Sequence, residues 1–451
     1  MFLAALLLST TPSAWVPARW TSSDAASLDL LKPTPVNCLL VEHDKWSKPF
    51  AAAAAKQGVA VLGVVRPGPS ALDQAREAVN LGLTGVVLEG DFPDRIPHAL
   101  ADSKITAVEL SPRAKMRFDA AEPIVGTDQG IWPGVEVQKD GQAKSAPSGA
   151  PWIDTNTGFL RFVHALTPST IWIANLPPPN TVITTNRYLQ TIGDAAMSGA
   201  RWVVSLDDDL NKRLLARDPK ALAAWAQIGQ CLQFYEDHPA WRTYQPRSDL
   251  GIVEGVSSGA LLSGGILDMI AVKHTPVRPL PASTVSPGSM KGLTMAADVD
   301  PASLTPAQRA ALAAFTRSGG TLLNAPPGWK FVLPKDGAIV LDASSLQQLD
   351  EIWKELNSLT GRQNLGARLF NVSTMISNLV QAPSGSPVLL HLINYSDFPV
   401  ESITIHLLGT FHHARLLAPG QKPIELQPYA VDEGTGVDID KMDSVAALEL
   451  E

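Results

Sequence analysis

Residues 59–65 read Val-Ala-Val-Leu-Gly-Val-Val, an uninterrupted apolar run. Such a run without polar alternation is typical of a parallel strand, because other elements cover both of its faces. Seven similar short runs occur between residues 36 and 206, and helix-like or loop segments separate them. This alternation predicts parallel strands that are joined by crossovers.

The eight runs match the number of strands in a (β/α)8 barrel, a TIM-like α/β fold in which helices pack outside the strands. The predicted strands are residues 36–41, 59–65, 85–88, 105–110, 123–126, 151–153, 170–174 and 202–206. A helix from near Asn186 ends before Gly199, and another opens at Asp218-Pro219, where Asp caps and Pro takes the first helical position. We assign the barrel to residues 33–247.

After residue 247 the pattern restarts as a smaller α/β domain, which we assign to residues 248–345. Its predicted strands are residues 250–254, 277–280, 293–296 and 321–324. Thr305-Pro306 opens a helix, Gln308 stands in capping-box register, and Gly319-Gly320 ends the helix before the last strand. Residues 366–451 show strand-like runs between Pro, Gly and Asn turns, without helix signals, and predict an antiparallel β-sandwich.

Composition excludes several classes of function. The chain has 451 residues, is 45% hydrophobic and 18% charged, and carries a formal net charge of -8 without a run of Lys and Arg. It therefore has no electrostatic footprint for nucleic acid. The nine histidines show no zinc-site spacing and there is no Walker or Rossmann glycine motif, so we expect neither a metal nor an organic cofactor. Cys38 and Cys231 are expected to be buried.

The N-terminus has the pattern of a secretory leader. Residues 1–8 read Met-Phe-Leu-Ala-Ala-Leu-Leu-Leu, Ser, Thr and Pro follow, and Val16-Pro17-Ala18 fits a cleavage tripeptide. We expect a signal peptide over residues 1–18 and bacterial-type export to the periplasm or the medium. Beyond it, no stretch approaches the ~18 apolar residues of a membrane span.

Two segments carry a resemblance to a known class of enzyme. They are Tyr188-Leu-Gln-Thr-Ile-Gly-Asp-Ala-Ala-Met-Ser-Gly-Ala-Arg-Trp-Val-Val-Ser-Leu-Asp207 and Leu312-Ala-Ala-Phe-Thr-Arg-Ser-Gly-Gly-Thr-Leu-Leu323. The first resembles a final barrel hairpin, and the second resembles the helix, Gly-Gly turn and strand of a glutamine-amidotransferase-like domain. In this order, with a C-terminal β-sandwich, the parts resemble multidomain glycoside hydrolases such as some β-galactosidases.

The resemblance implies a carbohydrate substrate, glycosidic bond cleavage in an oligo- or polysaccharide, and self-association, to which the small α/β domain contributes in similar enzymes. It also implies catalytic glutamates at the ends of barrel strands four and seven. The fourth predicted strand offers Glu109, whereas the seventh ends in Asn175 followed by Leu-Pro-Pro-Pro. This departure puts the standard retaining mechanism in doubt.

Carboxylates at the strand ends are the candidates for catalysis, because the βα loops of a barrel all open on its C-terminal face. Cleavage of a glycosidic bond requires two carboxyl groups, one protonated and one ionised. Our catalytic candidates follow neighbouring strands and are Glu89, Glu109, Asp128 and Asp154. The alternative is that some of them only bond backbone amides or pair with Arg66 and Arg113.

Further polar and aromatic residues at the strand ends are candidates for substrate binding. Aromatic faces stack on sugar rings, while polar side chains bind hydroxyl groups. The candidates are Glu42, His43, Arg66, Asp91, Trp132, Trp152, Asn156, Asn175 and Asp207. For the two tryptophans the alternative is that they pack loops onto the barrel.

Two other functions stay open at this point. A barrel of this kind can bind carbohydrate without cleaving it, and the missing acid after the seventh strand favours that hypothesis. Gly255-Val-Ser-Ser-Gly259 fits the G-x-S-x-G elbow of a serine esterase centred on Ser257. The esterase requires an imidazole within hydrogen-bond reach of Ser257; the alternative is a turn of small residues between a strand and a helix.

Overall fold

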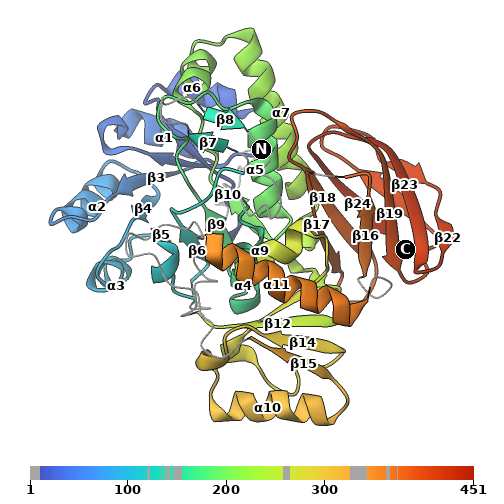
Figure 1. Cartoon of the computed structure of the whole chain (residues 1–451). Helices are drawn as coiled ribbons and strands as arrows, with labels where there is room; N and C mark the ends of the chain where they lie inside the picture. The colour runs from blue at the N-terminus through green and yellow to red at the C-terminus, as the bar shows by residue number, and fades with distance from the viewer. Residues whose placement is uncertain are drawn as a thin grey trace, which may run out of the picture.

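The computed structural model shows a barrel, a smaller α/β domain and a C-terminal domain of two antiparallel sheets (Figure 1). The described residues are 11–118, 122–133, 135–137, 143–145, 155–256, 265–325, 343–361, 366–372 and 374–451. Within these ranges, no helix combines the length and the apolar content that a membrane span requires.

The barrel is an eight-stranded parallel sheet in the order β1-β2-β3-β4-β5-β6-β9-β10. Its strands are β1 (Pro17–Trp20), β2 (Cys38–Val41), β3 (Ala60–Val65), β4 (Gly85–Glu89), β5 (Ala107–Ser111), β6 (Ile124–Thr127), β9 (Thr170–Ile173) and β10 (Ala200–Trp202). The predicted (β/α)8 architecture is confirmed. Short strands β7 (Val135–Val137) and β8 (Ala143–Ser145) form a hairpin between β6 and the next helix.

The strand that completes the barrel is not the one that the sequence predicted. β1 lies upstream of the predicted start at residue 33 and overlaps the end of the segment interpreted as a leader, whereas β6 pairs directly with β9. In the barrel sheet, no strand therefore stands between β6 and β9, and residues 151–153 lie outside the described ranges. Val16 and Ala18 are buried, so cleavage after Ala18 would remove half of a barrel strand.

Contacts between β1 and the chain after β10 bring the two ends of the sheet together. The backbone N–H of Arg19 donates to the carbonyl of Val204 at 2.8 Å, and the N–H of Val204 donates to the carbonyl of Pro17 at 3.1 Å. One parallel bridge, Ala18 to Val204, joins the edges. The sheet is thus nearly closed, and Pro17 is tolerated because it is the first residue of its strand.

Side chains alternate between the barrel interior and the surrounding helices, as the strand period of two requires. One apolar cluster fills the interior and includes Leu40, Leu62, Val87, Leu110 and Trp172, whereas their sequence neighbours pack in the larger cluster outside. We call this alternation strand parity. It also decides whether a side chain just beyond a strand end points toward the barrel interior or toward the helices, and so which of these residues can share a site.

In the described part of the barrel, the helices are α1 (Lys48–Lys56), α2 (Ala71–Asn80), α3 (Arg95–Asp102), α4 (Thr157–Leu166), α5 (Thr185–Ala196), α6 (Asp208–Leu215) and α7 (Pro219–Glu236). The predicted cap of α7 is confirmed, because the Asp218 side chain accepts a hydrogen bond from the N–H of Ala221 at 3.0 Å. Such a cap satisfies one of the backbone donors that a helix leaves unpaired at its start.

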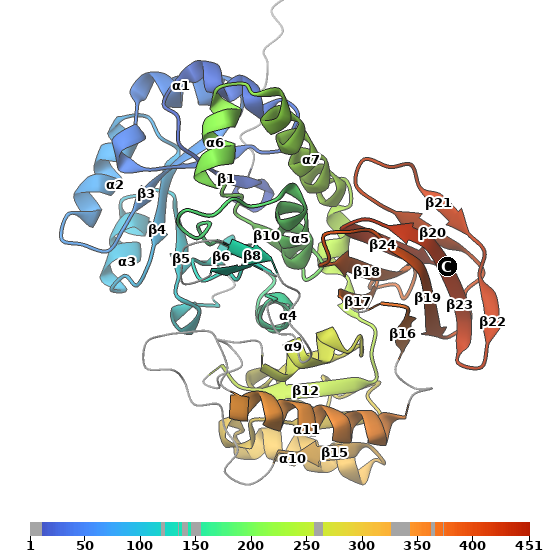
Figure 2. The same ribbon diagram turned by 45° about the horizontal axis from the view of Figure 1, so that its top comes forward.

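The smaller domain has a four-stranded parallel sheet in the order β13-β12-β14-β15. Its elements are β12 (Leu250–Glu254), α9 (Gly265–Val272), β13 (Arg278–Pro281), β14 (Met295–Asp298), α10 (Pro306–Arg317), β15 (Thr321–Asn324) and α11 (Ala343–Thr360). The predicted capping box of Thr305 and Gln308 is present. In Figure 2, α9 lies between this sheet and the barrel. The predicted α/β domain with its parallel sheet is confirmed, whereas its resemblance to a glutamine-amidotransferase-like domain stays a prediction.

The C-terminal domain consists of two antiparallel sheets that share one apolar core. The first sheet contains β11 (Gln245–Pro246), β17 (Met375–Gln381), β18 (Val388–Asn394), β24 (Val445–Leu450), β20 (Ala414–Leu417) and β21 (Ile424–Leu426). The second contains β16 (Ala367–Phe370), β19 (Val400–Leu408), β23 (Gly434–Met442) and β22 (Tyr429–Val431). Ile403 and Ile405 of β19 meet Leu390 and Leu392 of β18 in the core.

Buried polar contacts fix the C-terminal domain against helix α5 of the barrel. Arg187 donates to the carbonyl of Tyr395 at 2.7 Å, and the Tyr395 hydroxyl donates to the Asp194 carboxylate at 2.6 Å. Gln190 donates to the carbonyls of Asn394 and Ser396. Polar groups buried at such an interface require matched partners, so the contacts fix one relative placement of the two domains.

Gly158 sets the distance between the barrel helix α4 and helix α9, and we expect Gly158→Ala to destabilise the protein. The Gly158 N–H donates to Oδ1 of Asp268 at 2.6 Å, and an added Cβ would lie 2.6 Å from the Asp268 nitrogen. Overpacking of this kind costs about 1–3 kcal/mol, which exceeds the gain of up to about 1 kcal/mol in helix propensity. Denaturant unfolding measures the difference.

Gly288→Ala is the matched control, since only the Ser286 hydroxyl, at 3.7 Å, would meet its Cβ. An unfolding midpoint for Gly158→Ala at or above that of the parent would show that the α4–α9 contact is not close-packed.

Candidate active site

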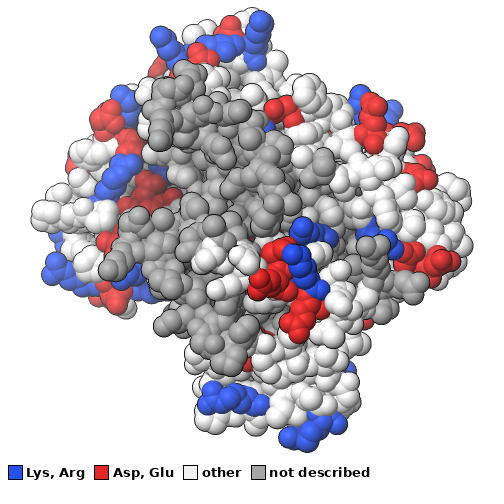
Figure 3. All heavy atoms as spheres, viewed as in Figure 1, with Lys and Arg blue, Asp and Glu red and all other residues white. Residues whose placement is uncertain are grey.

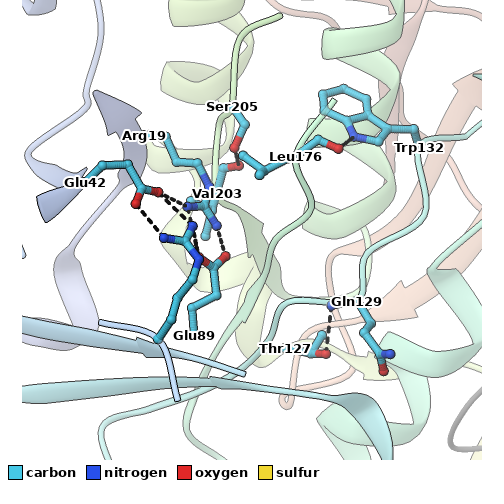
Figure 4. A network of polar contacts seen from close by, with 10 residues as sticks. Arg19, Glu42, Glu89, Thr127, Gln129, Trp132, Leu176, Val203 and Ser205 are labelled. Carbon is cyan, nitrogen blue, oxygen red and sulfur yellow. Dashed lines mark hydrogen bonds and ion pairs between the residues drawn. The ribbon is translucent and has the colours of Figure 1, made fainter. Parts of the chain in front are cut away.

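Five charged residues gather at the C-terminal mouth of the barrel. Strand parity places them on the interior face. Glu42, Arg66 and Glu89 each lie two residues after an interior residue, namely Leu40, Val64 and Val87. Arg19 has the interior parity on β1, and Asp128, just beyond the end of β6, has the parity of the interior residue Ile124. Figure 4 shows Arg19, Glu42 and Glu89 pointing toward one another. We name Arg19, Glu42, Arg66, Glu89 and Asp128 the mouth cluster.

Four members of the mouth cluster form an alternating network of ion pairs. Arg66 binds both oxygens of Glu42, at 2.6 and 2.9 Å, and reaches Oε2 of Glu89 at 3.2 Å. Arg19 makes a short contact with Oε1 of Glu89 and lies 3.7 Å from Oε1 of Glu42. Both arginines therefore place charge-assisted hydrogen-bond donors against the Glu89 carboxylate.

The network has a buried half and an exposed half. The Arg19 and Glu89 side chains are 8% and 12% exposed, whereas Glu42 and Arg66 are 39% and 52% exposed. Less water therefore screens the attraction between Arg19 and Glu89, so their ion pair is stronger than an exposed pair. Glu89 is the carboxylate that the fold holds most firmly at the mouth.

Asp128 is the second carboxyl group, and its surroundings favour the protonated form. Burial, and secondly the charge of Glu89, raise the pKa of Asp128 to about 6. Its Oδ1 atom is buried and has no hydrogen-bond partner among the described residues. A carboxyl group with a raised pKa beside a second carboxyl group is the combination that acid-assisted cleavage uses.

Glu109 does not join the mouth cluster, because it has the opposite parity on β5 from the interior residues Val108 and Leu110. Its side chain pairs with Arg117 outside the barrel wall. There it lines a hollow of about 410 Å³, which we name the rim pocket and which is bounded by Asp91, Phe92, Pro93, Asp94, Glu109, Ser111, Lys115 and Arg117. Asp91, a predicted binding residue, lies in the same pocket.

Several predicted binding residues have structural contacts instead. The Asp207 side chain caps α6 by accepting from the N–H of Leu210 at 3.0 Å, and Asn156 is fully buried between Arg113 and Asp194. Asn175 donates to the carbonyl of Gly130 at 2.6 Å. These polar groups therefore bond to loop backbone or to other buried polar side chains, and their role in substrate binding stays a prediction.

Trp132 and His43, two further candidates for substrate binding, make their described contacts outside the mouth cluster. Trp132 is 4% exposed and packs edge-on against Trp202 and Tyr188, so its ring faces protein. His43 is exposed and contacts Glu77 at 3.2 Å. Trp152, Asp154 and Ser257 lie outside the described residues. Across the ranges that the structure describes, no group of His, Cys, Asp and Glu has the arrangement of a metal site.

Sequence reasoning missed Arg19, which connects both glutamates of the mouth cluster. Residues 15–20 alternate, with Trp15 among the interior residues and Val16, Ala18 and Trp20 packing outside. This alternation is the signal that was available, but the preceding apolar run favoured a leader. With β1 counted, Glu89 ends the fourth strand of the barrel, and Asn175 still follows the seventh.

Comparisons with known proteins support the architecture. No protein-family model matches the chain, and no curated protein matches it in sequence. Among solved structures, α-L-fucosidase isoenzyme 2 from Paenibacillus thiaminolyticus is similar with a TM-score of 0.59 and 10% identity, over 97% of this chain and 99% of that chain. A β-galactosidase from Rahnella sp. R3 is similar with a TM-score of 0.56 and 8% identity, over 98% and 99%.

Both similarities span nearly the whole length of both chains. The resemblance to multidomain glycoside hydrolases is therefore confirmed for the fold. At 8–10% identity the likeness concerns the fold alone, and a fold of this kind supports many chemistries, so function has to be argued from the mouth cluster.

Proposed function

We propose that the chain is a glycoside hydrolase in which Asp128 donates a proton to the leaving oxygen and Glu89 supplies the ionised carboxylate. The observation that carries this proposal is the pairing of two carboxyl groups in unlike environments at the mouth. Burial and the Glu89 charge raise the pKa of Asp128 to about 6, whereas the Glu89 carboxylate lies against the guanidinium groups of Arg19 and Arg66. Glycosidases need one protonated and one ionised carboxyl group on either side of the scissile bond.

A carbohydrate substrate is supported by the structural neighbours, whose names describe an α-L-fucosidase and a β-galactosidase. It is also supported by surface charge. Among the described residues on the face in Figure 3, cationic and anionic side chains are interspersed and form no broad field of one sign that would attract a polyanion. Neutral polyhydroxylated ligands fit such a surface. The reaction needs no organic cofactor in this proposal.

Binding without cleavage is the second candidate function, and one observation favours it. The loop after β9, the seventh strand, carries Asn175 in place of an acid, and Asn175 is engaged with the Gly130 carbonyl. In that case Arg19 and Arg66 would hold Glu42 and Glu89 as acceptors for sugar hydroxyl groups. The serine esterase stays an untested hypothesis because Ser257 lies outside the described residues.

Hydrolysis by the purified protein tests the proposal. The panel comprises aryl α-L-fucosides, aryl β-D-galactosides, other aryl glycosides, and plant and microbial polysaccharides. We expect sugar release from at least one member, followed by reducing-end assay and chromatography. Saturable binding of one glycan without any turnover would overturn the enzyme and support the binding barrel.

We also propose that the protein is exported. The apolar run of residues 1–8 supports this proposal. Because Trp15 and Val16 are buried in the barrel, processing would have to occur upstream of Trp15, not at the predicted tripeptide.

A further inference from the structure

The rim pocket lies one strand away from the mouth cluster and opens on the same face of the barrel. Glu89 of β4 is in register with Leu110 of β5, and the Gly90 N–H donates to the Leu110 carbonyl at 2.9 Å. Neighbouring strands are about 4.8 Å apart. Asp91, which lines the pocket, follows Glu89 by two residues, so only the turn at Gly90 separates the two sites.

The charged residues of the rim pocket pair with one another across the loop after β4, strand β5 and the loop after β5. Arg117 contacts Glu109 and lies 3.5 Å from Asp94, and Lys115 lies 3.8 Å from Asp91. The arginine, the lysine and both aspartates are 41% to 83% exposed. Exposed pairs of this kind contribute little, about 0–1 kcal/mol, so a ligand can replace them at low cost.

This combination of groups suits a neutral sugar. Each hydroxyl group can donate to a carboxylate and accept from a guanidinium or ammonium group, and the pocket offers both kinds. Phe92, which is half-buried, adds an apolar ring for the C–H face of a sugar. The rim pocket has three carboxylates and two cationic side chains, and this excess of negative charge disfavours an acidic sugar.

We propose that the rim pocket binds a neutral sugar unit adjacent to the one held at the mouth cluster, so that the substrate is an oligo- or polysaccharide chain. The inference rests on the proposed function and deepens it by assigning a second binding site. It gives Glu109 and Asp91 a role in binding, with Phe92 and Arg117 as their partners.

Calorimetric titration with cellohexaose, xylohexaose, mannohexaose, galactohexaose and oligogalacturonate tests the inference. The full-length protein carries Glu89→Gln so that no ligand is consumed. We expect one neutral hexasaccharide to bind and Phe92→Ala to weaken its Kd about three- to tenfold. Arg117→Gln is expected to weaken it as well. Phe398→Ala removes a 77% exposed ring of the C-terminal domain and is the matched control.

Three results would overturn the inference: no hexasaccharide binds, the Phe92 and Arg117 variants bind as tightly as the control, or oligogalacturonate binds most tightly. Hydrolysis of the same hexasaccharides by the parent is measured separately. Binding that depends on Phe92, without hydrolysis, would reject the glycosidase while supporting the rim pocket.

Discussion

Asp128→Asn is expected to lower kcat on unactivated oligosaccharides by about 10²- to 10⁴-fold, the contribution of a general acid. Asparagine has nearly the shape of aspartic acid but cannot donate the proton that the leaving oxygen needs. Burial and Glu89 raise the pKa of Asp128 to about 6, so the parent carboxyl group is protonated below that pH. Steady-state kinetics of parent and variant measure the loss.

The pH dependence has a definite sign. The acid works only when protonated, so the parent rate is expected to fall as the pH rises through about 6. This alkaline limb should be absent from whatever activity Asp128→Asn retains. Dinitrophenyl glycosides provide the control, because their leaving group departs without a proton and the variant should cleave them well. An unchanged profile on natural substrates would remove Asp128 from the role of acid.

Glu89→Gln is expected to reduce turnover of all substrates, activated ones included, by about 10³-fold or more. The substitution keeps the size of the side chain but removes the charge that would stabilise or attack the cationic sugar centre. Glu42 still lies 3.7 Å from Arg19, so the buried guanidinium keeps an anionic neighbour and the variant should fold. Circular dichroism and unfolding midpoints verify this before kinetics are compared.

Glu42→Gln is the matched control for Glu89→Gln, since it removes a more exposed carboxylate from the same ion-pair network. We expect a loss of at most about tenfold. Equal losses in the two variants would mean that the network is structural and that Glu89 has no special role. The anomeric configuration of the first sugar that the parent releases decides the role of Glu89: retention would assign it as the nucleophile, and inversion would assign it as the base.

The strand pattern was predictable because it depends on local composition. Parallel strands are covered on both faces, so runs such as residues 59–65 contain almost only apolar residues and are recognisable from sequence. Helix ends at Asp218 and Thr305 were also predictable, because capping involves side chains within three residues of the helix start. The same local rules identified Glu42, Arg66, Glu89 and Asp128 as residues at strand ends.

The composition of the candidate site was decided by tertiary structure. Glu89 and Glu109 are both carboxylates near strand ends, yet strand parity relative to the interior core places Glu89 in the mouth cluster and Glu109 in the rim pocket. Asn156 and Asp207 form hydrogen bonds with segments distant in sequence, which sequence reasoning could not foresee, and their role in binding stays a prediction.

The sequence by itself located seven of the eight barrel strands and the carboxylates that follow several of them, because burial on both faces leaves its pattern in adjacent residues. Only the tertiary structure decided that residues 17–20 close the barrel, that Arg19 joins Glu89, and that Asp128 is buried near the charge of Glu89. These properties depend on which segments meet in space and on how much water remains between them, and neither is encoded in residues that are neighbours along the chain.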